Sequence, residues 1–284
     1  MPDFAIVDTH VHLYDWVSIR YPWMAGLATL ESPHGPAVYT NAIGGVVVDK
    51  IVFVEVAPDD SQNLDEVRWV AEQAKTDRRI QGMVATVALE KGREVEAEIA
   101  AFAKMPLARD IRRLIQDHAD EPGWCLRPRY LDGVKLVGEY GLGCEIGIRH
   151  PQMRDAIELV RRFPEIRFTI DHIGKPGIKA GLMEPWKSEI RELAQLPNII
   201  CKVSGVVTEA DYESWTYDQV APYIAHAIEV FGFDRVMFGG DWPVMELATR
   251  YPAWVAMVDR ITAGASPIDL RKLYRDTAIQ HYRL

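Results

Sequence analysis

The choice among parallel α/β folds rests on FAIVDTHVHL, residues 4–13. Its apolar first half predicts a short buried strand, and two histidines, His10 and His12, stand where that strand should end. An open doubly wound sheet would be expected to carry a glycine-rich turn after its first strand, and DTHVHL is no GxGxxG. The stretch therefore favours another parallel α/β architecture, and the strands and helices predicted in the rest of the chain indicate which one.

Seven further apolar, β-branched runs follow, each short enough for a strand. They span residues 50–56, 80–89, 110–116, 141–148, 166–174, 198–206 and 234–243. Helix-period segments lie between most of them, at 63–76, 92–105, 151–163, 185–196 and 217–232. Because the runs are apolar throughout and alternate with helices, they predict a parallel sheet with both faces covered.

Eight strand–helix units in 284 residues favour a (β/α)8 TIM-type barrel over an open sheet. We therefore expect one α/β domain over residues 1–284, distorted by a long loop after the first strand, at 13–49. That loop is rich in proline, glycine and aromatic residues, and we expect it to fold over the barrel mouth.

Charge and hydropathy exclude several classes of protein. The formal net charge of -9 argues against a phosphate-backbone partner such as nucleic acid. No apolar run approaches the roughly 18 residues of a membrane span, and the N-terminus lacks a basic region followed by an apolar one. We expect a cytoplasmic protein, monomeric or homo-oligomeric. Its three cysteines show no CxxC spacing and predict reduced, mostly structural thiols.

Barrel geometry gives a filter for functional residues, because side chains at the C-terminal ends of the strands face the catalytic mouth. Polar and ionisable residues gather at these strand ends. They are His10, His12, Glu55, Arg112, Gln116, Glu145, His172, Lys202, Ser204 and Asp241. Since the first and eighth strands of a barrel are neighbours, closure should bring His10 and His12 together with Asp241.

Each of these motifs also has an ordinary structural interpretation. His10 and His12 alone are compatible with two partly exposed histidines, and His172 with a strand-end histidine bonded to backbone. Asp241 alone is compatible with a turn or helix-capping residue before Pro243. Their joint appearance at strand ends favours a metal or catalytic role, since imidazole and carboxylate groups are common zinc ligands.

Two basic residues are predicted to bind substrate oxygens. Arg112 offers a forked donor for a carboxylate or lactone oxygen, although Arg113 beside it is an alternative for the inward position. Lys202 is costly to bury unpaired, so it either binds a substrate oxygen or forms an ion pair with Glu145 or Asp171.

Further residues complete the predicted substrate-binding set. The mouth filter adds Glu55 and Glu145, and the long first loop adds His34. Four aromatic residues form either a sugar-stacking wall or ordinary loop packing: Tyr14, Trp16, Trp23 and Trp242.

Five motifs, in order along essentially the whole chain, resemble one family. They are DTHVHL (8–13), YPW (21–23), IDHIGKP (170–176), CKVSG (201–205) and FGGDWPV (238–244). Together they resemble the amidohydrolase superfamily, and within it the branch of sugar-lactone hydrolases that includes L-fuconolactonase and L-rhamnono-lactonase. The combination is specific, whereas a single motif would not be.

The resemblance implies a (β/α)8 barrel that hydrolyses a cyclic ester with an activated water. It matches His10 and His12 to the first-strand pair, His172 to the sixth-strand histidine, and Asp241 to the eighth-strand general base. Lys202 and Arg112 match a lysine and an arginine of the same branch. The implied enzyme is a lactonase, a hydrolase of carboxylic esters in carbohydrate metabolism, which opens a sugar-acid lactone to an aldonate or aldarate.

Several positions depart from the family's pattern. The arginine strand reads DIR instead of GIR, FGSDWP has become FGGDWP, and Cys144-Glu145 stands in the fifth strand where many relatives have phenylalanine and aspartate. The usual Asn-Ala near the C-terminus is Asp276-Thr277-Ala278. These departures leave the fold intact but weaken any claim about the particular substrate.

The metal prediction is one divalent ion. The fifth strand has no histidine, so a binuclear site is not expected unless Glu145 acts as a bridge. His10, His12, His172 and Asp241 provide three or four ligands for one Zn²⁺. Because a lactone is already electrophilic, its hydrolysis does not strictly need the ion. The ion is therefore either required, dispensable or absent.

The expected mechanism has Asp241 take a proton from water while His10, His12, His172 or zinc stabilises the oxyanion. Two alternative enzymes share this machinery: a sugar-diacid lactone isomerase and a zinc-dependent nonoxidative decarboxylase of the same superfamily. A binding protein on a barrel that has lost its activity is the non-enzymatic alternative.

Overall fold

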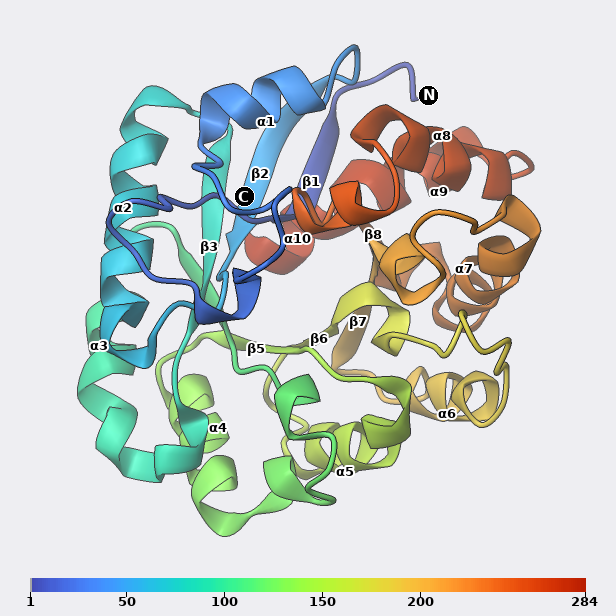
Figure 1. The fold of residues 1–284 in the computed structure, drawn as a ribbon. Helices are drawn as coiled ribbons and strands as arrows, with labels where there is room; N and C mark the ends of the chain where they lie inside the picture. The colour runs from blue at the N-terminus through green and yellow to red at the C-terminus, as the bar shows by residue number, and fades with distance from the viewer. Residues whose placement is uncertain (1) are drawn as a thin grey trace.

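Eight parallel strands, paired in chain order, form the centre of the molecule in the computed structural model, which describes residues 2–284 (Figure 1). The strands are β1 (Ile6–Val11), β2 (Val48–Val54), β3 (Ile80–Thr86), β4 (Ala108–Arg112), β5 (Gly143–Ile146), β6 (Phe168–Ile170), β7 (Ile199–Ser204) and β8 (Val236–Gly239). Each predicted strand is present, with its ends shifted by a few residues. The strand order confirms the (β/α)8 barrel.

The ring closes where β1 meets the end of β8. Thr9 Oγ1 donates to the Phe238 carbonyl at 2.6 Å, and Val11 forms a parallel bridge with Trp242. Register shifts interrupt the pairing of β1 with β2, β2 with β3, and β3 with β4, so the barrel is distorted on this side.

Helices cover the outside of the ring (Figure 1). They are α1 (Pro36–Ala42), α2 (Asn63–Thr76), α3 (Glu96–Ala103), α4 (Pro128–Glu139), α5 (Met153–Arg162), α6 (Trp186–Leu193), α7 (Tyr217–Phe231), α8 (Tyr251–Ile261), α9 (Pro267–Arg271) and α10 (Thr277–Tyr282). The five predicted helices are confirmed. Within residues 2–284, no helix combines the length and apolar character needed to cross a membrane.

Some helices were not predicted. The long segment 13–49 is not entirely loop, because α1 forms within it, and its buried Tyr39 donates a hydrogen bond to Asp8 at 2.8 Å. Helix α4 carries Gly133, which has low helix propensity. A side chain at Gly133 would collide with the backbone of Leu89, so close packing explains a glycine that obscures the helical pattern.

Helix α10 closes the N-terminal end of the barrel. Interior strand residues form a small apolar cluster with Ala278 and Tyr282 of this helix. The hydroxyl of Tyr282 donates to Glu145 Oε1 at 2.5 Å, and His281 Nε2 lies 2.9 Å from Thr169 Oγ1. The barrel is therefore filled from below, and its mouth is the end at which substrate can enter.

Candidate active site

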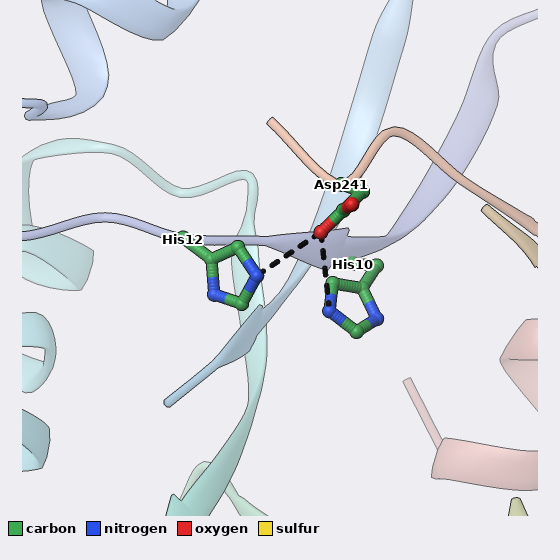
Figure 2. Close-up of side chains that lie close together, drawn as sticks. All are labelled: His10, His12 and Asp241. Atoms are coloured by element: carbon green, nitrogen blue, oxygen red, sulfur yellow. Dashed lines mark hydrogen bonds and ion pairs between the residues drawn. The ribbon is translucent and has the colours of Figure 1, made fainter. Parts of the chain in front are cut away.

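Three buried side chains converge where β1 meets β8. His10 lies in β1, His12 follows it, and Asp241 stands two residues beyond β8. His12 Nε2 is 3.2 Å and His10 Nε2 is 3.7 Å from Asp241 Oδ1 (Figure 2). These three residues form a group of possible metal ligands, as the closure of the first strand against the last predicts.

Backbone geometry fixes Asp241 in this position. Its φ of 59° is in the left-handed region, and its N–H donates to the His10 carbonyl at 2.7 Å. Gly205, at the end of the CKVSG motif, also has a positive φ, and a side chain there would collide with the Asp241 carboxylate. Glycine is therefore required at position 205 for the carboxylate to reach the histidines.

The tautomer of His12 bears directly on metal binding. Its Nδ1 lies 2.9 Å from the Val54 carbonyl, which can only accept, so Nδ1 carries a proton and donates. In the neutral ring, Nε2 then presents a lone pair to the Asp241 carboxylate. Two acceptors at this distance need a cation between them, either a proton or a metal. The donor set thus fits a divalent metal, with the backbone carbonyl orienting the ligand.

His172 lies beside this group but does not join it. It follows β6 in a turn with φ 51°, and its Nδ1 lies 2.9 Å from Ser204 Oγ and 3.9 Å from Asp241 Oδ2. Its possible ligand group is a different one, with His10 and Asp171. That His172 ligates the same ion as His12 stays a prediction, and in this structure its ring contacts Ser204 of β7.

Electrostatics keep the Asp241 carboxylate ionised and favour the neutral forms of His10 and His172. Burial alone would raise the pKa of Asp241, but His172, His12 and His10 together lower it. Burial lowers the pKa of His172 to about 4, although Asp241 opposes the shift. Burial likewise lowers the pKa of His10 well below its ordinary value. At neutral pH, Asp241 can therefore accept a proton.

Beneath the three side chains lies an interior cluster of five buried charged residues: Glu55, Arg112, Glu145, Asp171 and Lys202. Arg112 Nε donates to Glu55 at 2.5 Å and its Nη1 donates to Asp171 at 3.0 Å. Lys202 Nζ lies 2.6 Å from Glu145 and 3.3 Å from Asp171. The ion-pair alternative for Lys202 is thus the one that the structure shows, and Arg112, not Arg113, is the inward arginine.

A cavity of about 570 Å³ opens above this floor, a volume suited to one small molecule. His12, Arg112, His172 and Asp241 border it. The rest of the lining is divided into two kinds of side chain. Apolar residues include Pro22, Trp23, Leu27, Val56, Val244 and Leu247, whereas polar residues include Arg113, Gln116, Arg149, Lys175, Thr208 and Glu209.

Of the nine residues named above as candidates for substrate binding, Arg112 and Trp23 border this cavity. Glu55, Glu145 and Lys202 lie in the interior cluster, fully engaged by one another and by their neighbours, so the structure gives them a structural position instead. Their position near the C-terminal ends of the strands was predicted correctly, but that criterion does not tell whether a side chain reaches the cavity or lies below it in the barrel interior.

Three of the four aromatic residues considered for a sugar-stacking wall do not border the cavity. Tyr14, His34 and Trp242 are buried together in loop packing, with ring centroids 4.8 Å apart for Tyr14 and His34 and 5.2 Å for His34 and Trp242. Trp16 packs parallel to Tyr21, away from the cavity lining. These contacts are the ordinary loop packing that was the alternative interpretation.

Two basic residues border the cavity and were missed. Lys175 belongs to IDHIGKP, and Arg149 follows the fifth strand. The IDHIGKP motif was the available signal for Lys175, since it extends beyond the strand end into the loop that lines the mouth.

Known proteins are similar to this chain over nearly its whole length. An uncharacterized protein, y4mH, from Sinorhizobium fredii is 29% identical, with complete coverage of both chains. An L-fucono-1,5-lactonase from Burkholderia ambifaria is 28% identical, covering 98% of this chain and 95% of the relative. The crystal structure of an amidohydrolase from Burkholderia multivorans with bound Zn has a TM-score of 0.89 at 26% identity, covering 99% of this chain and 100% of the other.

A family profile described as Amidohydrolase matches residues 7–284. The match includes β2 to β8, all of β1 except Ile6, and every residue of the site described above. The chain therefore belongs to the amidohydrolase family.

Proposed function

We propose that this protein hydrolyses a sugar-acid lactone to the open-chain aldonate or aldarate, with Asp241 activating the water. The observation that carries the proposal is an ionised, buried carboxylate at the floor of a cavity sized for one small molecule. The lactonase relative, similar over nearly the full length of both chains, supports a cyclic ester as the substrate.

The proposed reaction needs one residue to move a proton twice. Asp241 accepts a proton from water as the water oxygen forms a bond to the lactone carbonyl carbon. The tetrahedral intermediate then collapses, the bond from that carbon to the ring oxygen breaks, and Asp241 returns the proton to this oxygen. The product is a hydroxy acid with its ring open.

Arg112 is suited to stabilise the oxyanion of this intermediate. It borders the cavity, and its Nη1 lies 3.2 Å from His10 Nε2. Burial alone would lower the pKa of Arg112, but Glu55 and Asp171 raise it, so the guanidinium stays charged. A fixed positive charge in a dry site stabilises developing negative charge without reorganisation.

His10, His12 and Asp241 would hold a divalent metal, and we propose Zn²⁺ from their nitrogen and oxygen donors. Such an ion would supply Lewis-acid polarisation of the carbonyl oxygen. His172, which lies outside this group, remains free to orient the substrate from the other side of the cavity floor.

The test combines a lactone panel with one substitution. The wild-type protein is expected to open at least one aldono- or aldaro-lactone, and NMR of the product distinguishes hydrolysis from isomerisation. Asp241→Asn should lower kcat by about 10²- to 10⁴-fold, the usual contribution of a general base. Asp65→Asn, an exposed carboxylate on α2, is the matched control and should keep full activity.

Two outcomes would contradict the proposal. One is wild-type turnover by a correctly folded Asp241→Asn variant, as judged by circular dichroism. The other is the failure of wild-type protein, with or without added Zn²⁺, to open any lactone of the panel.

A further inference from the structure

Two cations from different loops meet on the polar side of the cavity. Arg149 follows β5, Lys175 follows β6, and both approach Glu209, which follows β7. We call these three residues the mouth cluster. Arg149 Nη1 and Lys175 Nζ each lie 3.8 Å from a Glu209 oxygen, which is too long for a hydrogen bond. Neither cation is therefore held closely by this carboxylate.

The charges of the mouth cluster do not balance. Arg112 is paired with Glu55 and Asp171, and Arg113 is paired with Glu90 at 2.6 Å and Asp60 at 3.1 Å. Within the mouth cluster, Arg149 and Lys175 share the single carboxylate of Glu209 and form no hydrogen bond with it, although Asp241 also acts on Lys175.

The exposed Asp117 on this side does not pair with the two cations either, since it forms no ion pair with any described Lys, Arg or His. A substrate carboxylate can therefore provide the close acceptor oxygens that Glu209 does not.

Lys175 is held in place by a neutral partner. Its Nζ donates to Gln116 Oε1 at 2.7 Å, which leaves two ammonium hydrogens for other acceptors. Burial lowers the pKa of Lys175, Glu209 and Asp241 oppose that shift, and Arg149 adds to it. All three charged groups thus act on the ammonium, so it lies within electrostatic range of both Asp241 and Arg149.

The composition of the lining favours an anionic group on one side of the cavity. Arg149 and Lys175 offer two strong cationic donors there, whereas the opposite side is apolar and includes Trp23 and Leu247. Polar side chains of the floor and wall, including His12, His172 and Thr208, are available to the ring hydroxyls of the same substrate.

We infer that the substrate lactone carries an additional carboxylate, which binds between Arg149 and Lys175 while the ring carbonyl faces Asp241. This inference rests on the lactone hydrolysis proposed above and narrows it to lactones of diacids. The guanidinium can donate two parallel hydrogen bonds to one carboxylate, and the ammonium can add a third.

The test compares lactones that differ only in this group. Aldono- and aldaro-1,4-lactones of the same stereochemistry differ at the end of the chain, where one has a hydroxymethyl group and the other a carboxylate. For wild-type protein, kcat/KM should be at least about tenfold higher for the aldaro-lactone, since charged hydrogen bonds of this kind commonly exceed that ratio.

Arg149→Gln and Lys175→Gln should each lower this preference by about tenfold, mainly through KM of the aldaro-lactone, and the double variant should abolish it. Arg154→Gln is the matched control. Arg154 lies on α5, its side chain is mostly exposed, and it pairs with Glu189 and Glu192 outside the cavity. This variant should keep the wild-type preference.

The outcomes separate the two proposals. If neutral lactones are opened with the same kcat/KM as their acidic partners, the anionic subsite is overturned and lactone hydrolysis stands. The same conclusion holds if the double variant retains the preference. If neither type of lactone is opened by wild-type protein, the proposed function itself fails.

Discussion

The interior cluster and the mouth cluster use the same kinds of residue in opposite ways. In the interior cluster, Arg112 and Lys202 meet carboxylates at distances from 2.5 to 3.3 Å. In the mouth cluster, Arg149 and Lys175 stay 3.8 Å from the carboxylate that they share. The first set of charges is buried within the barrel, with Arg112 alone reaching the cavity floor, whereas the second lines the open side of that cavity.

The difference follows from the cost of removing charges from water. An unpaired charge in the barrel interior would cost several kcal/mol, so each cation there must be matched as the chain folds. At the mouth, water solvates the half-exposed Arg149 and the neutral Gln116 accepts a hydrogen bond from Lys175, so an incompletely matched charge is tolerated. A basic residue with loose partners at a cavity is therefore the better indicator of a ligand.

The largest effect should come from breaking the interior cluster. Arg112→Met leaves Glu55 and Asp171 buried without their partner and should lower the free energy of unfolding by about 3–5 kcal/mol. Urea unfolding followed by tryptophan fluorescence measures the change. Arg154→Met on the surface is the control, with an expected change within about 0.5 kcal/mol. An equal loss of unfolding free energy in Arg112→Met and Arg154→Met would show that the buried ion pairs of the interior cluster do not stabilise the fold more than surface ion pairs do.

The stability of the protein should decrease in acid because His172, at the cavity floor, is buried in its neutral form. The pKa of His172 is about 4 in the folded protein, against an ordinary value of 6.5. Between these values the unfolded chain binds the proton and the folded one does not. Stability should therefore fall as pH drops from 6.5 toward 4, by roughly 3 kcal/mol in total.

His172→Gln isolates this contribution from that of other titrating groups. Unfolding of both proteins is measured at several pH values, with a chelator present to remove metal. The variant should show a shallower loss of stability in acid. Parallel curves for the two proteins would mean that His172 is solvated and can be protonated in the fold.

A smaller effect should define how far the interior cluster extends. Tyr282→Phe removes the hydroxyl that donates to Glu145 and should cost about 1–2 kcal/mol of stability, because a buried acceptor loses a partner. Thermal unfolding at fixed pH measures it. Tyr212→Phe, an exposed tyrosine, serves as the control. No change on Tyr282→Phe would place Tyr282 outside the cluster.

The smallest effect is expected at the mouth. Arg149→Met should change the free energy of unfolding by less than about 0.5 kcal/mol, since the side chain is half exposed and its ion pair is long. The same urea titration as for Arg112→Met makes the comparison direct. A loss above 2 kcal/mol would show that the mouth cluster also stabilises the fold.

Strand periodicity predicted the barrel and the meeting of His10 and His12 with Asp241. This succeeded because closure of a (β/α)8 ring places the first strand beside the last, whatever the loops do. The turn that carries His172 could not be foreseen in the same way, since its positive φ depends on local packing and brings the ring against Ser204.

Depth within the barrel was the other quantity that periodicity could not give. Lys202 lies in the middle of β7 and therefore below the cavity, although its motif suggested a residue at the mouth. Arg149 and Lys175 lie beyond their strands, in loops whose paths depend on tertiary contacts. The pattern of the strands therefore predicted the residues at the floor of the site, but it could not predict which loop residues form the cavity walls.

Helix α10 links completion of the barrel to the order in which the chain is synthesised. The five residues of the interior cluster come from β2 through β7, yet Glu145 receives a hydrogen bond from Tyr282, which leaves the ribosome after all eight strands. A nascent chain that has not reached Thr277 can pair every strand but lacks the apolar and hydrogen-bonding contacts that fill the barrel from below. Completion of the barrel must then wait until translation has passed its final helix.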